Sequence, residues 1–402
     1  MRMGRCFFLL GIFLYVILGM TSAMAQTSEK KIIVNLPSRT LEYYCGDFVK
    51  QYPVAIGSPL TPTPLGQFKI TSLDVNPWWY PPNGGQAVPS GPHNPLGYRW
   101  IEFLPAYGIH GTNAPWSIGL AVSNGCIRMR EPDVEELFEM VSLGTSVSIT
   151  YERIRICIDR RGKATLSIYP DLYNYRSITP DDVVKKLEES GCGGLLTERD
   201  IQNLMKTGTE HQIILAYFHQ LMLNGKQLGP KGFSTGEVKY VPVKEVANEM
   251  RTAITWDAKN QLVRWGSRFA SGKIRGGVLY VASENIPVLF GGQQQYRPDT
   301  NTIEMEILTW FLNGIPMNGE PPHMGKVPSV PVLPLAQALG QKISWDAETL
   351  TLTIRGRRVP VEMVNGQPYI PITHIFEYFQ AYVYWNEAAR SVELTYPQGG
   401  ND

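Results

Sequence analysis

A repeat between residues 220 and 396 constrains the fold of this chain more than any other feature. A proline is followed 14 positions later by a tryptophan, and an apolar residue lies seven positions beyond the tryptophan. The pattern occurs at Pro242, Trp256 and Val263, at Pro331, Trp345 and Leu352, and at Pro371, Trp385 and Val392. A helical pattern lies between proline and tryptophan, and a hairpin with Asp or Asn in its turn follows. Because one such unit cannot bury its apolar face alone, we expect the units to stack into an α+β domain over residues 220–396.

The length and composition of the chain predict two or three globular domains. It has 402 residues, of which 43% are hydrophobic and 18% are charged, so it can bury apolar cores. Lys and Arg number 37, and Asp and Glu number 36. A protein that binds nucleic acid through bulk electrostatics needs a clear positive excess. The near-zero net charge therefore argues against nucleic acid as a partner.

The first 25 residues have the pattern of a secretory signal peptide. Arg2 and Arg5 form a positive region, an apolar run extends from Phe7 to Leu18, and Ala23-Met24-Ala25 is an A-x-A cleavage site. An uncleaved membrane anchor is the alternative, but the run is shorter than the about 20 apolar residues that span a bilayer. We therefore expect residues 1–25 to be removed and the protein to be exported to the extracellular face or the cell wall.

Residues 30–151 predict a mainly β domain with short helices. Apolar and polar residues alternate around Ile32, Val34 and Leu36, and a helix is expected over Glu131–Val141. The stretch 76–97 is rich in Pro, Gly and aromatic residues and has no periodicity, which suggests a functional loop. Its aromatic residues either face solvent, where they could stack on substrate, or pack the loop against the domain; they are Trp78, Trp79 and Tyr80.

Residues 152–219 predict an α/β connecting region. A hairpin around residues 159–162 precedes two helices, one over Pro180–Glu189 with Thr179 as its N-cap and one over Thr197–Thr207. No chemistry can be assigned to this region from its sequence.

Two short segments carry the residue types of a thiol-based acyl-transfer site. They are His110-Gly111-Thr112-Asn113 and Ser123-Asn124-Gly125-Cys126-Ile127-Arg128-Met129. A cysteine attacks a carbonyl carbon as a thiolate, and a neighbouring imidazole is the usual base that removes its proton. The glycines allow sharp turns and close approach of a substrate. A buried structural thiol and a core histidine are the alternative interpretations of Cys126 and His110, and the complete string favours nucleophile and base.

These segments resemble the active-site signature of the L,D-transpeptidases of the YkuD type, which cross-link peptidoglycan. The Thr-Pro-Gly loop at 61–66 matches that family too. The resemblance implies a YkuD-like β-sandwich over residues 30–151, with Cys126 as nucleophile and His110 as general base. It also implies that the Gly111 carbonyl orients the imidazole, as an aspartate does in a triad.

The resemblance further implies an oxyanion hole and a substrate pocket beside the cysteine. The N–H groups of Gly125 and Cys126 would stabilise the oxyanion. Arg128 would either bind a substrate carboxylate or form a structural salt bridge. Ser123 would bond the histidine or line the pocket, to which Asn124 would also belong.

The implied reaction begins with attack of Cys126 on the amide between the L-centre of a diamino acid and the terminal D-alanine of a stem peptide. D-Alanine leaves, and the amine of a neighbouring stem resolves the thioester into a cross-link, without a cofactor. Two other functions remain open. One is an L,D-carboxypeptidase with water as acceptor, and the other is a non-catalytic protein that binds the cell wall.

The repeats resemble the copper amine oxidase N-terminal-like, or stalk, domain of secreted bacterial proteins. No copper is implied, because the region contains only His323 and His374 and no clustered ligands. The repeats would hold the enzyme at the wall or act as a spacer.

A metal or a disulfide is a further possibility for the cysteines. His93, His110 and Cys126 could supply three zinc ligands, but they lack the paired spacing typical of zinc sites, so no metal is expected. Cys6 would leave with the signal peptide. A Cys157–Cys192 disulfide is possible, and Cys45, Cys157 and Cys192 could equally be small buried thiols.

Overall fold

The computed structural model describes residues 29–82, 84–207 and 209–397. The expected signal peptide, residues 1–25, lies outside the described residues. The chain divides into two compact units, Met1–Tyr151 and Glu152–Asp402, and each is described by itself below. None of the helices in the described ranges combines the length and the apolar character needed to cross a bilayer.

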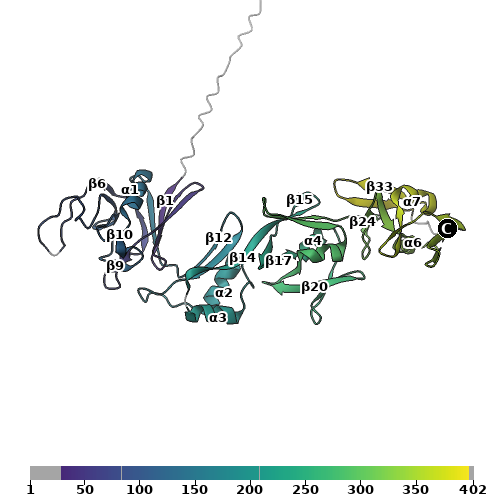
Figure 1. Cartoon of the computed structure of the whole chain (residues 1–402), viewed down its shortest axis with the longest axis horizontal. Helices are drawn as coiled ribbons and strands as arrows, with labels where there is room; N and C mark the ends of the chain where they lie inside the picture. Colours follow the sequence, from purple (N-terminus) through teal and green to yellow (C-terminus); the bar gives the residue numbers. More distant parts are fainter. Residues whose placement is uncertain (1–28, 83, 208, 398–402) are drawn as a thin grey trace, which may run out of the picture. The chain divides into compact units, whose positions relative to one another are not determined.

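The first unit is mainly β (Figure 1). One of its sheets has the strand order β3-β2-β1-β11-β5, with β1 and β11 parallel, and another has the order β10-β8-β7-β6. Phe68 of β5 packs on Phe103 of β7 with ring centroids 5.3 Å apart, so the two sheets share a core. The predicted alternation is confirmed, because Ile32 and Val34 are fully buried. The strands are β1 Lys30–Asn35, β2 Thr40–Cys45, β3 Phe48–Pro53, β5 Gly66–Lys69, β6 Ser72–Val75, β7 Arg99–Leu104, β8 Tyr107–His110, β10 Ile127–Arg128, β11 Ser146–Thr150 and the separate pair β4 Ile56–Gly57 and β9 Ala121–Ser123.

A helix and a long loop complete the first unit. Helix α1, Glu131–Met140, has Pro in its first turn and buries Val134 and Leu137, which confirms the predicted helix. The loop 76–97 is folded on itself by a Trp79–Val88 bridge and by Asn94, which is fully buried. Trp78 and Tyr80 are 54% and 72% exposed, so these two rings face solvent rather than pack the loop down.

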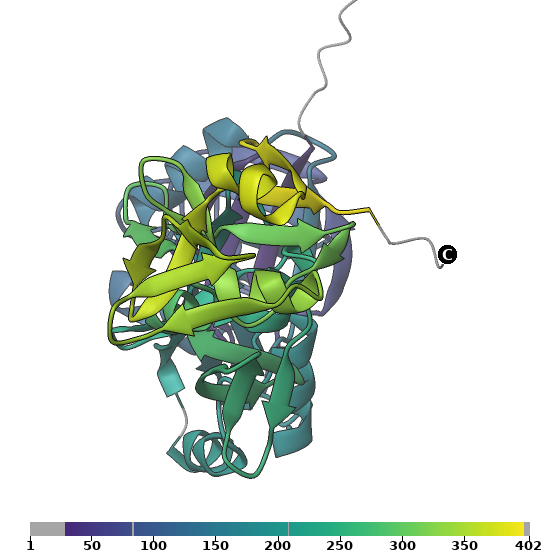
Figure 2. The ribbon, with the colours of Figure 1, turned by 90° about the vertical axis from the view of Figure 1, so that its right-hand side faces the viewer.

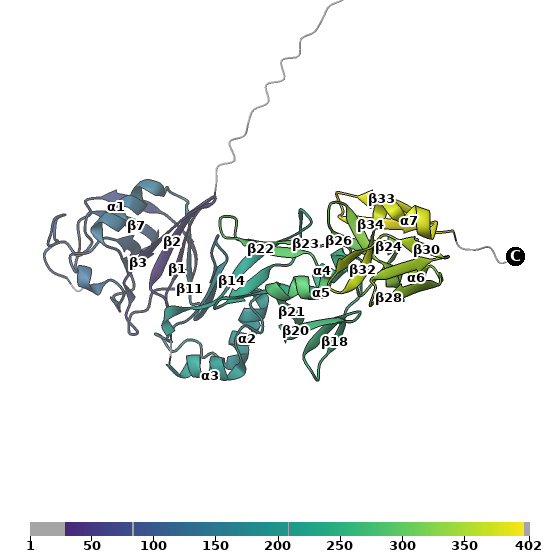
Figure 3. The same ribbon diagram turned by 45° about the vertical axis from the view of Figure 1, so that its right-hand side comes forward.

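The second unit begins with a hairpin and two helices, as predicted. Helix α2, Pro180–Glu189, starts with a capping box between Thr179 and Asp182. Helix α3, Glu198–Thr207, begins after Thr197 and contacts α2 (Figure 3). The hairpin strands are β12 Ile154–Ile158 and β13 Lys163–Ile168.

Strand β14, Thr209–Leu223, runs through the division that we expected at residue 219. It pairs with β13 early in its length and with β16 and β23 later. Because one continuous strand belongs to both regions, residues 152–219 and the first repeats share a sheet. The connecting region is therefore not a separate folding unit.

Four cysteines among the described residues are free thiols: Cys45, Cys126, Cys157 and Cys192. Cys192 is fully buried in the core beneath α2 and α3. The Cys157–Cys192 disulfide that the sequence left open is therefore absent, and Cys192 is a buried thiol.

The predicted helix–hairpin repeats are present in the rest of the second unit. Each repeat consists of a strand, a short helix and a hairpin (Figure 1). The tryptophan and the apolar residue seven positions later are direct cross-strand partners, as in Trp256–Val263, Trp345–Leu352 and Trp385–Val392. The seven-residue spacing is therefore set by the length of a tight antiparallel hairpin.

A further repeat, which the sequence pattern did not predict, lies between the first and the second predicted repeats. Ala282 replaces the proline, Tyr296 stands 14 positions later, and Ile303 pairs with Tyr296 across the hairpin. The sequence pattern missed this unit because neither proline nor tryptophan is present.

The four repeats form two modules of two repeats each. Equivalent positions in the two modules are 89 residues apart, for example Asn224 and Asn313. The first module spans residues 220–307 and the second 309–396. Asn224 N–H donates to Met305 O at 2.9 Å, and Asn313 N–H donates to Leu394 O at 2.8 Å. The same contact recurs at the same offset, so the two modules repeat one internal architecture.

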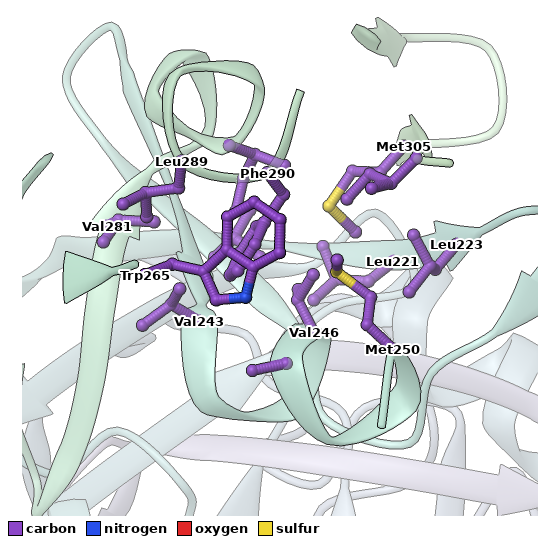
Figure 4. Close-up of a cluster of buried hydrophobic side chains, with 14 of the residues drawn as sticks. Leu221, Leu223, Val243, Val246, Met250, Trp265, Val281, Leu289, Phe290 and Met305 are labelled. Atoms are coloured by element: carbon purple, nitrogen blue, oxygen red, sulfur yellow. The ribbon is translucent and has the colours of Figure 1, made fainter. Parts of the chain in front are cut away.

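The first module encloses a continuous apolar core (Figure 4). Trp265 meets Phe290 edge-on with ring centroids 5.4 Å apart. Its elements are β14, β15 Lys226–Gln227, β16 Gly232–Thr235, β17 Val238–Pro242, α4 Val243–Glu249, β18 Thr255–Asp257, β19 Leu262–Trp265, β20 Arg268–Arg275, β21 Val278–Ala282, α5 Ile286–Phe290, β22 Gln293–Arg297 and β23 Thr302–Glu306.

The second module, whose ribbon is yellow-green and yellow in Figure 2, has its own core around Trp310 and Phe379, both almost fully buried. Its elements are β24 Thr309–Leu312, β25 Ile315–Pro316, β26 His323–Met324, β27 Pro328–Pro331, α6 Val332–Ala338, β28 Ile343–Asp346, β29 Thr351–Ile354, β30 Arg357–Val359, β31 Glu362–Val364, β32 Gln367–Pro371, α7 Ile372–Phe379, β33 Tyr382–Asn386 and β34 Ser391–Thr395.

Candidate active site

His110 is the last residue of β8 and is buried, with 4% of its surface exposed. Its Nδ1 lies 2.6 Å from the Gly111 carbonyl oxygen, which accepts a hydrogen bond from the Nδ1–H. In this tautomer the lone pair is on Nε2. Burial lowers the pKa of His110 to about 4, and the nearby Arg128 charge adds to this effect. The imidazole is therefore neutral at pH 7 and can accept a proton through Nε2.

Trp100 fixes the plane of the imidazole. It lies opposite His110 in the β7–β8 pair, and the two rings stack with centroids 5.6 Å apart and planes 25° apart. The indole also fills the space beside Gly108, where a Cβ atom would lie 2.8 Å from the ring. Any side chain at Gly108 would therefore displace the ring that packs on His110.

Cys126 directly precedes β10, which is parallel to β8. The register pairs Ile127 with Ile109 and Arg128 with His110. Because side chains alternate along a strand, Cys126, Arg128 and His110 lie on the same face of this sheet. The structure thus brings together the predicted nucleophile, base and arginine.

The thiol of Cys126 is half-buried, and its Sγ donates to the Ala106 carbonyl oxygen at 3.6 Å. Burial raises the pKa of Cys126, while the Gly108 N–H and the Arg128 charge act in the opposite direction. The resting cysteine is therefore a thiol, and a thiol reacts as a nucleophile only once a base removes its proton.

Ser123 shapes the loop that carries the cysteine. Its hydroxyl donates to the Cys126 carbonyl oxygen at 2.5 Å and accepts from Gly125 N–H at 3.1 Å. Thr61 Oγ1 in turn donates to the Ser123 carbonyl oxygen at 2.9 Å, which attaches the 61–66 loop to this turn. Gly125 has φ +105, and a Cβ atom there would collide with the Tyr107 ring, so the position needs glycine.

These bonds bear on two of the predicted roles. The Gly125 N–H that we expected in the oxyanion hole is bonded to Ser123 in this structure. Ser123 itself bonds the loop and not the histidine. Asn124 is exposed to solvent.

Arg128 is half-buried and lies opposite His110 in the β8–β10 pair. Burial lowers the pKa of its guanidinium, which still stays charged at neutral pH. Within the described residues no carboxylate forms an ion pair with it. Of the two interpretations open from the sequence, this geometry favours contact with substrate over a structural salt bridge.

Glu131 is a site residue that the sequence did not suggest. Its carboxylate accepts hydrogen bonds from Thr112 N–H at 2.6 Å and from Tyr98 N–H at 3.1 Å. The carboxylate lies where a Cβ atom of Gly97 or Gly111 would be, so both positions exclude larger residues. In the sequence the only trace of this contact is glycine at 97 and 111, and a glycine does not identify the residue that occupies its Cβ space.

The zinc alternative has no support in the described residues. They contain no group of three or more His, Cys, Asp or Glu side chains that could hold a metal ion. His93 is exposed, and its contact with the site is through its backbone carbonyl, which accepts from Asn113 Nδ2 at 3.1 Å.

Comparison with known proteins identifies the first unit. The YkuD L,D-transpeptidase catalytic domain matches residues 29–149. A putative L,D-transpeptidase YkuD of Bacillus licheniformis is 48% identical over 127 residues, which cover 31% of this chain and 68% of that protein. A probable L,D-transpeptidase ErfK/SrfK of Escherichia coli strain K12 is 34% identical over 171 residues, covering 38% of this chain and 54% of the relative. The chain thus spans about half the length of the E. coli relative.

Among solved structures, an L,D-transpeptidase from Mycobacterium smegmatis aligns at 20% identity and a TM-score of 0.26, covering 31% of this chain and 59% of its own. Membership therefore rests on the sequence relatives and on the matched catalytic domain. The chain belongs to the L,D-transpeptidase family of acyltransferase enzymes, with its YkuD catalytic domain at residues 29–149.

Proposed function

We propose that the chain is an exported peptidoglycan L,D-transpeptidase that works through a thioester on Cys126. The observation that carries this proposal is the 2.6 Å bond from His110 Nδ1–H to the Gly111 carbonyl oxygen, because it leaves Nε2 as the base on the sheet face that also carries Cys126. Export is proposed from the signal pattern of residues 1–25.

The reaction starts from a neutral thiol and a neutral imidazole. As Cys126 Sγ attacks the amide carbonyl before the terminal D-alanine, His110 Nε2 takes the thiol proton. The C–N bond then breaks, His110 returns the proton to the leaving amine of D-alanine, and a thioester remains. The amine of a neighbouring stem attacks the thioester and regenerates the thiol while the cross-link forms.

The negative charge on the tetrahedral oxygen needs fixed donors. The Cys126 N–H and the Arg128 guanidinium serve this purpose in the proposed mechanism, since the Gly125 N–H is bonded to Ser123. If the oxyanion draws the Gly125 N–H away, the Ser123 hydroxyl still holds the loop through its bond to the Cys126 carbonyl.

Incubation with muropeptides tests the function in one experiment. The full chain is mixed with tetrapeptide stems, and the products are read by mass spectrometry. Loss of D-alanine with formation of cross-linked dimers is the expected result. Tripeptide stems without dimers would show an L,D-carboxypeptidase, and binding without any new product would show a wall-binding protein with no activity.

For residues 220–396 we propose that the copper amine oxidase N-terminal-like modules attach the enzyme to the cell wall. Retention of the second unit on insoluble wall is the test. Because β14 crosses residue 219, the fragment used must begin at Glu152, at the unit boundary. A passive spacer would not be retained.

A further inference from the structure

Glu131 is connected to the catalytic base through a single peptide group. Its Oε1 accepts from Thr112 N–H at 2.6 Å, and the carbonyl of the same Gly111–Thr112 peptide accepts from His110 Nδ1–H at 2.6 Å. The peptide is planar and conjugated, so its N–H and C=O lie on opposite sides. A carboxylate, a peptide and an imidazole therefore form one continuous hydrogen-bonded chain.

The place of the carboxylate is built into the backbone. Gly97 and Gly111 both lack a side chain where the carboxylate lies, and a Cβ atom at either would collide with it. The second oxygen accepts from Tyr98 N–H at 3.1 Å, which fixes the plane of the carboxylate. Glu131 is also the first residue of α1, where the helix dipole favours a negative charge.

This series of hydrogen bonds does more than hold the Gly111–Thr112 peptide in place. A negative charge at the N–H end of a peptide increases the negative charge on its carbonyl oxygen, because hydrogen bonds in a chain polarise one another. A stronger acceptor at Gly111 favours the Nδ1–H tautomer and makes Nε2 a better base. An aspartate does this by direct contact with the histidine in a Ser-His-Asp triad.

We propose that Glu131 is the positioning residue for His110, acting through the Gly111–Thr112 peptide to fix the Nδ1–H tautomer and to strengthen Nε2 as a base. The effect on catalysis rests on the proposed function, whereas the effect on the tautomer does not.

The experiment compares the full chain with Glu131→Gln and with a matched control on the same helix, Glu135→Gln. Glu135 forms an ion pair with Arg99 at 3.6 Å and does not bond the Gly111–Thr112 peptide. The readouts are the His110 tautomer, from nitrogen resonances of ¹⁵N-histidine-labelled protein, and the pH profile of Cys126 acylation by a carbapenem-type β-lactam.

In Glu131→Gln we expect a smaller Nδ1–H population, acylation slowed by about tenfold, and an acid limb moved to lower pH, since one pH unit of basicity corresponds to a tenfold change. Glu135→Gln should match the wild type. A merely structural role would slow acylation without moving the acid limb or the tautomer, and that result would overturn the proposal.

If Glu131→Gln does not fold, Glu131→Asp keeps the charge but is one methylene too short to reach both N–H groups. It should weaken the Nδ1–H signal, and a wild-type spectrum in folded Glu131→Asp would refute the proposal. Should the wild type fail to act on muropeptides, the proposed function falls, while the tautomer comparison still decides the role of Glu131.

Discussion

The two units each bury a histidine in a polar network, and only one of these histidines has a ring nitrogen left for chemistry. In the first unit His110 uses Nδ1 to bond the Gly111 carbonyl, and no side chain of the described residues hydrogen-bonds its Nε2. In the second unit both ring nitrogens of His219 are engaged: Nδ1 lies 2.5 Å from Asn301 Oδ1 and Nε2 lies 2.9 Å from Ser234 Oγ.

The tautomer of His219 follows from its partners. Asn301 Nδ2 donates to the carbonyls of Arg161 and Phe218, so Asn301 Oδ1 is the acceptor for His219 Nδ1–H. Ser234 then donates to Nε2. The group looks like a Ser-His-Asn triad, but Ser234 and His219 are both buried, and Asn301 ties them to the β12–β13 turn and to strand β14. The comparison indicates that the capacity of a buried histidine to accept a proton depends on which ring nitrogen is left unbonded, and not on burial or a low pKa alone.

The largest effect should come from Cys126→Ala. Removal of the only proposed nucleophile should lower D-alanine release by at least about a thousandfold. The thiol is on a loop, so the fold should remain, which thermal unfolding can check. Substantial D-alanine release by this variant would contradict the assignment of Cys126.

His110→Gln should slow acylation of Cys126 by roughly 10²–10⁴, the usual contribution of a general base. In the wild type the rate should fall as the pH drops through the His110 pKa of about 4, because an imidazolium cannot take the thiol proton. The measurement is the pH dependence of acylation. A profile in His110→Gln identical to that of the wild type would exclude a partnership between the two residues.

His219→Ala should have the opposite outcome, a loss of stability with activity retained. It leaves the Ser234 hydroxyl without its buried partner and Asn301 Oδ1 with only the Tyr296 hydroxyl as donor, at a cost of about 2 kcal/mol in the free energy of unfolding of the second unit. Urea denaturation measures the loss, and D-alanine release should remain at the wild-type level. If His219→Ala had the free energy of unfolding of the wild type but released no D-alanine, His219 would be needed for activity and not for stability, contrary to this prediction.

Both histidines should make the protein less stable in acid. Burial lowers the pKa of each below the ordinary 6.5, so the unfolded chain binds a proton first as the pH falls. The free energy of unfolding should therefore be highest above about pH 6.5. It should decrease as the pH falls below this value, and the contribution of His110 to the decrease should end at about pH 4. Urea midpoints across this range test the point, and His219→Gln should flatten the decrease in the second unit alone.

The smallest effect concerns a turn in the second module. Leu350 has φ +48 and is exposed, five positions after Trp345, where Asn301 stands in the hairpin that begins at Tyr296. Asparagine tolerates the left-handed region better than leucine. Leu350→Asn should raise the free energy of unfolding by about 0.5–1 kcal/mol, which thermal unfolding can resolve. A lower melting temperature would show that the turn is not strained by leucine.

The sequence predicted much of the fold through local patterns. The helices at Pro180–Glu189 and Glu131–Met140 were recognisable because caps and periodicity are local signals. The repeat was visible wherever proline and tryptophan were present. It was missed at Ala282 and Tyr296, where smaller or different side chains fill the same positions. The continuity of β14 was also missed, because no local signal shows which strands a long strand will join.

The sequence by itself determined the pair His110 and Cys126, their order, and the glycines around them. The tertiary structure decided how those residues are used. Parallel pairing of β8 and β10 puts both on one face, Ser123 engages the Gly125 N–H, and Glu131 reaches the Gly111–Thr112 peptide from the start of α1. These contacts join residues that are distant along the chain or bonded through backbone atoms, which every residue type possesses. A motif specifies which side chains are available, and only the folded chain determines which donors and acceptors remain free.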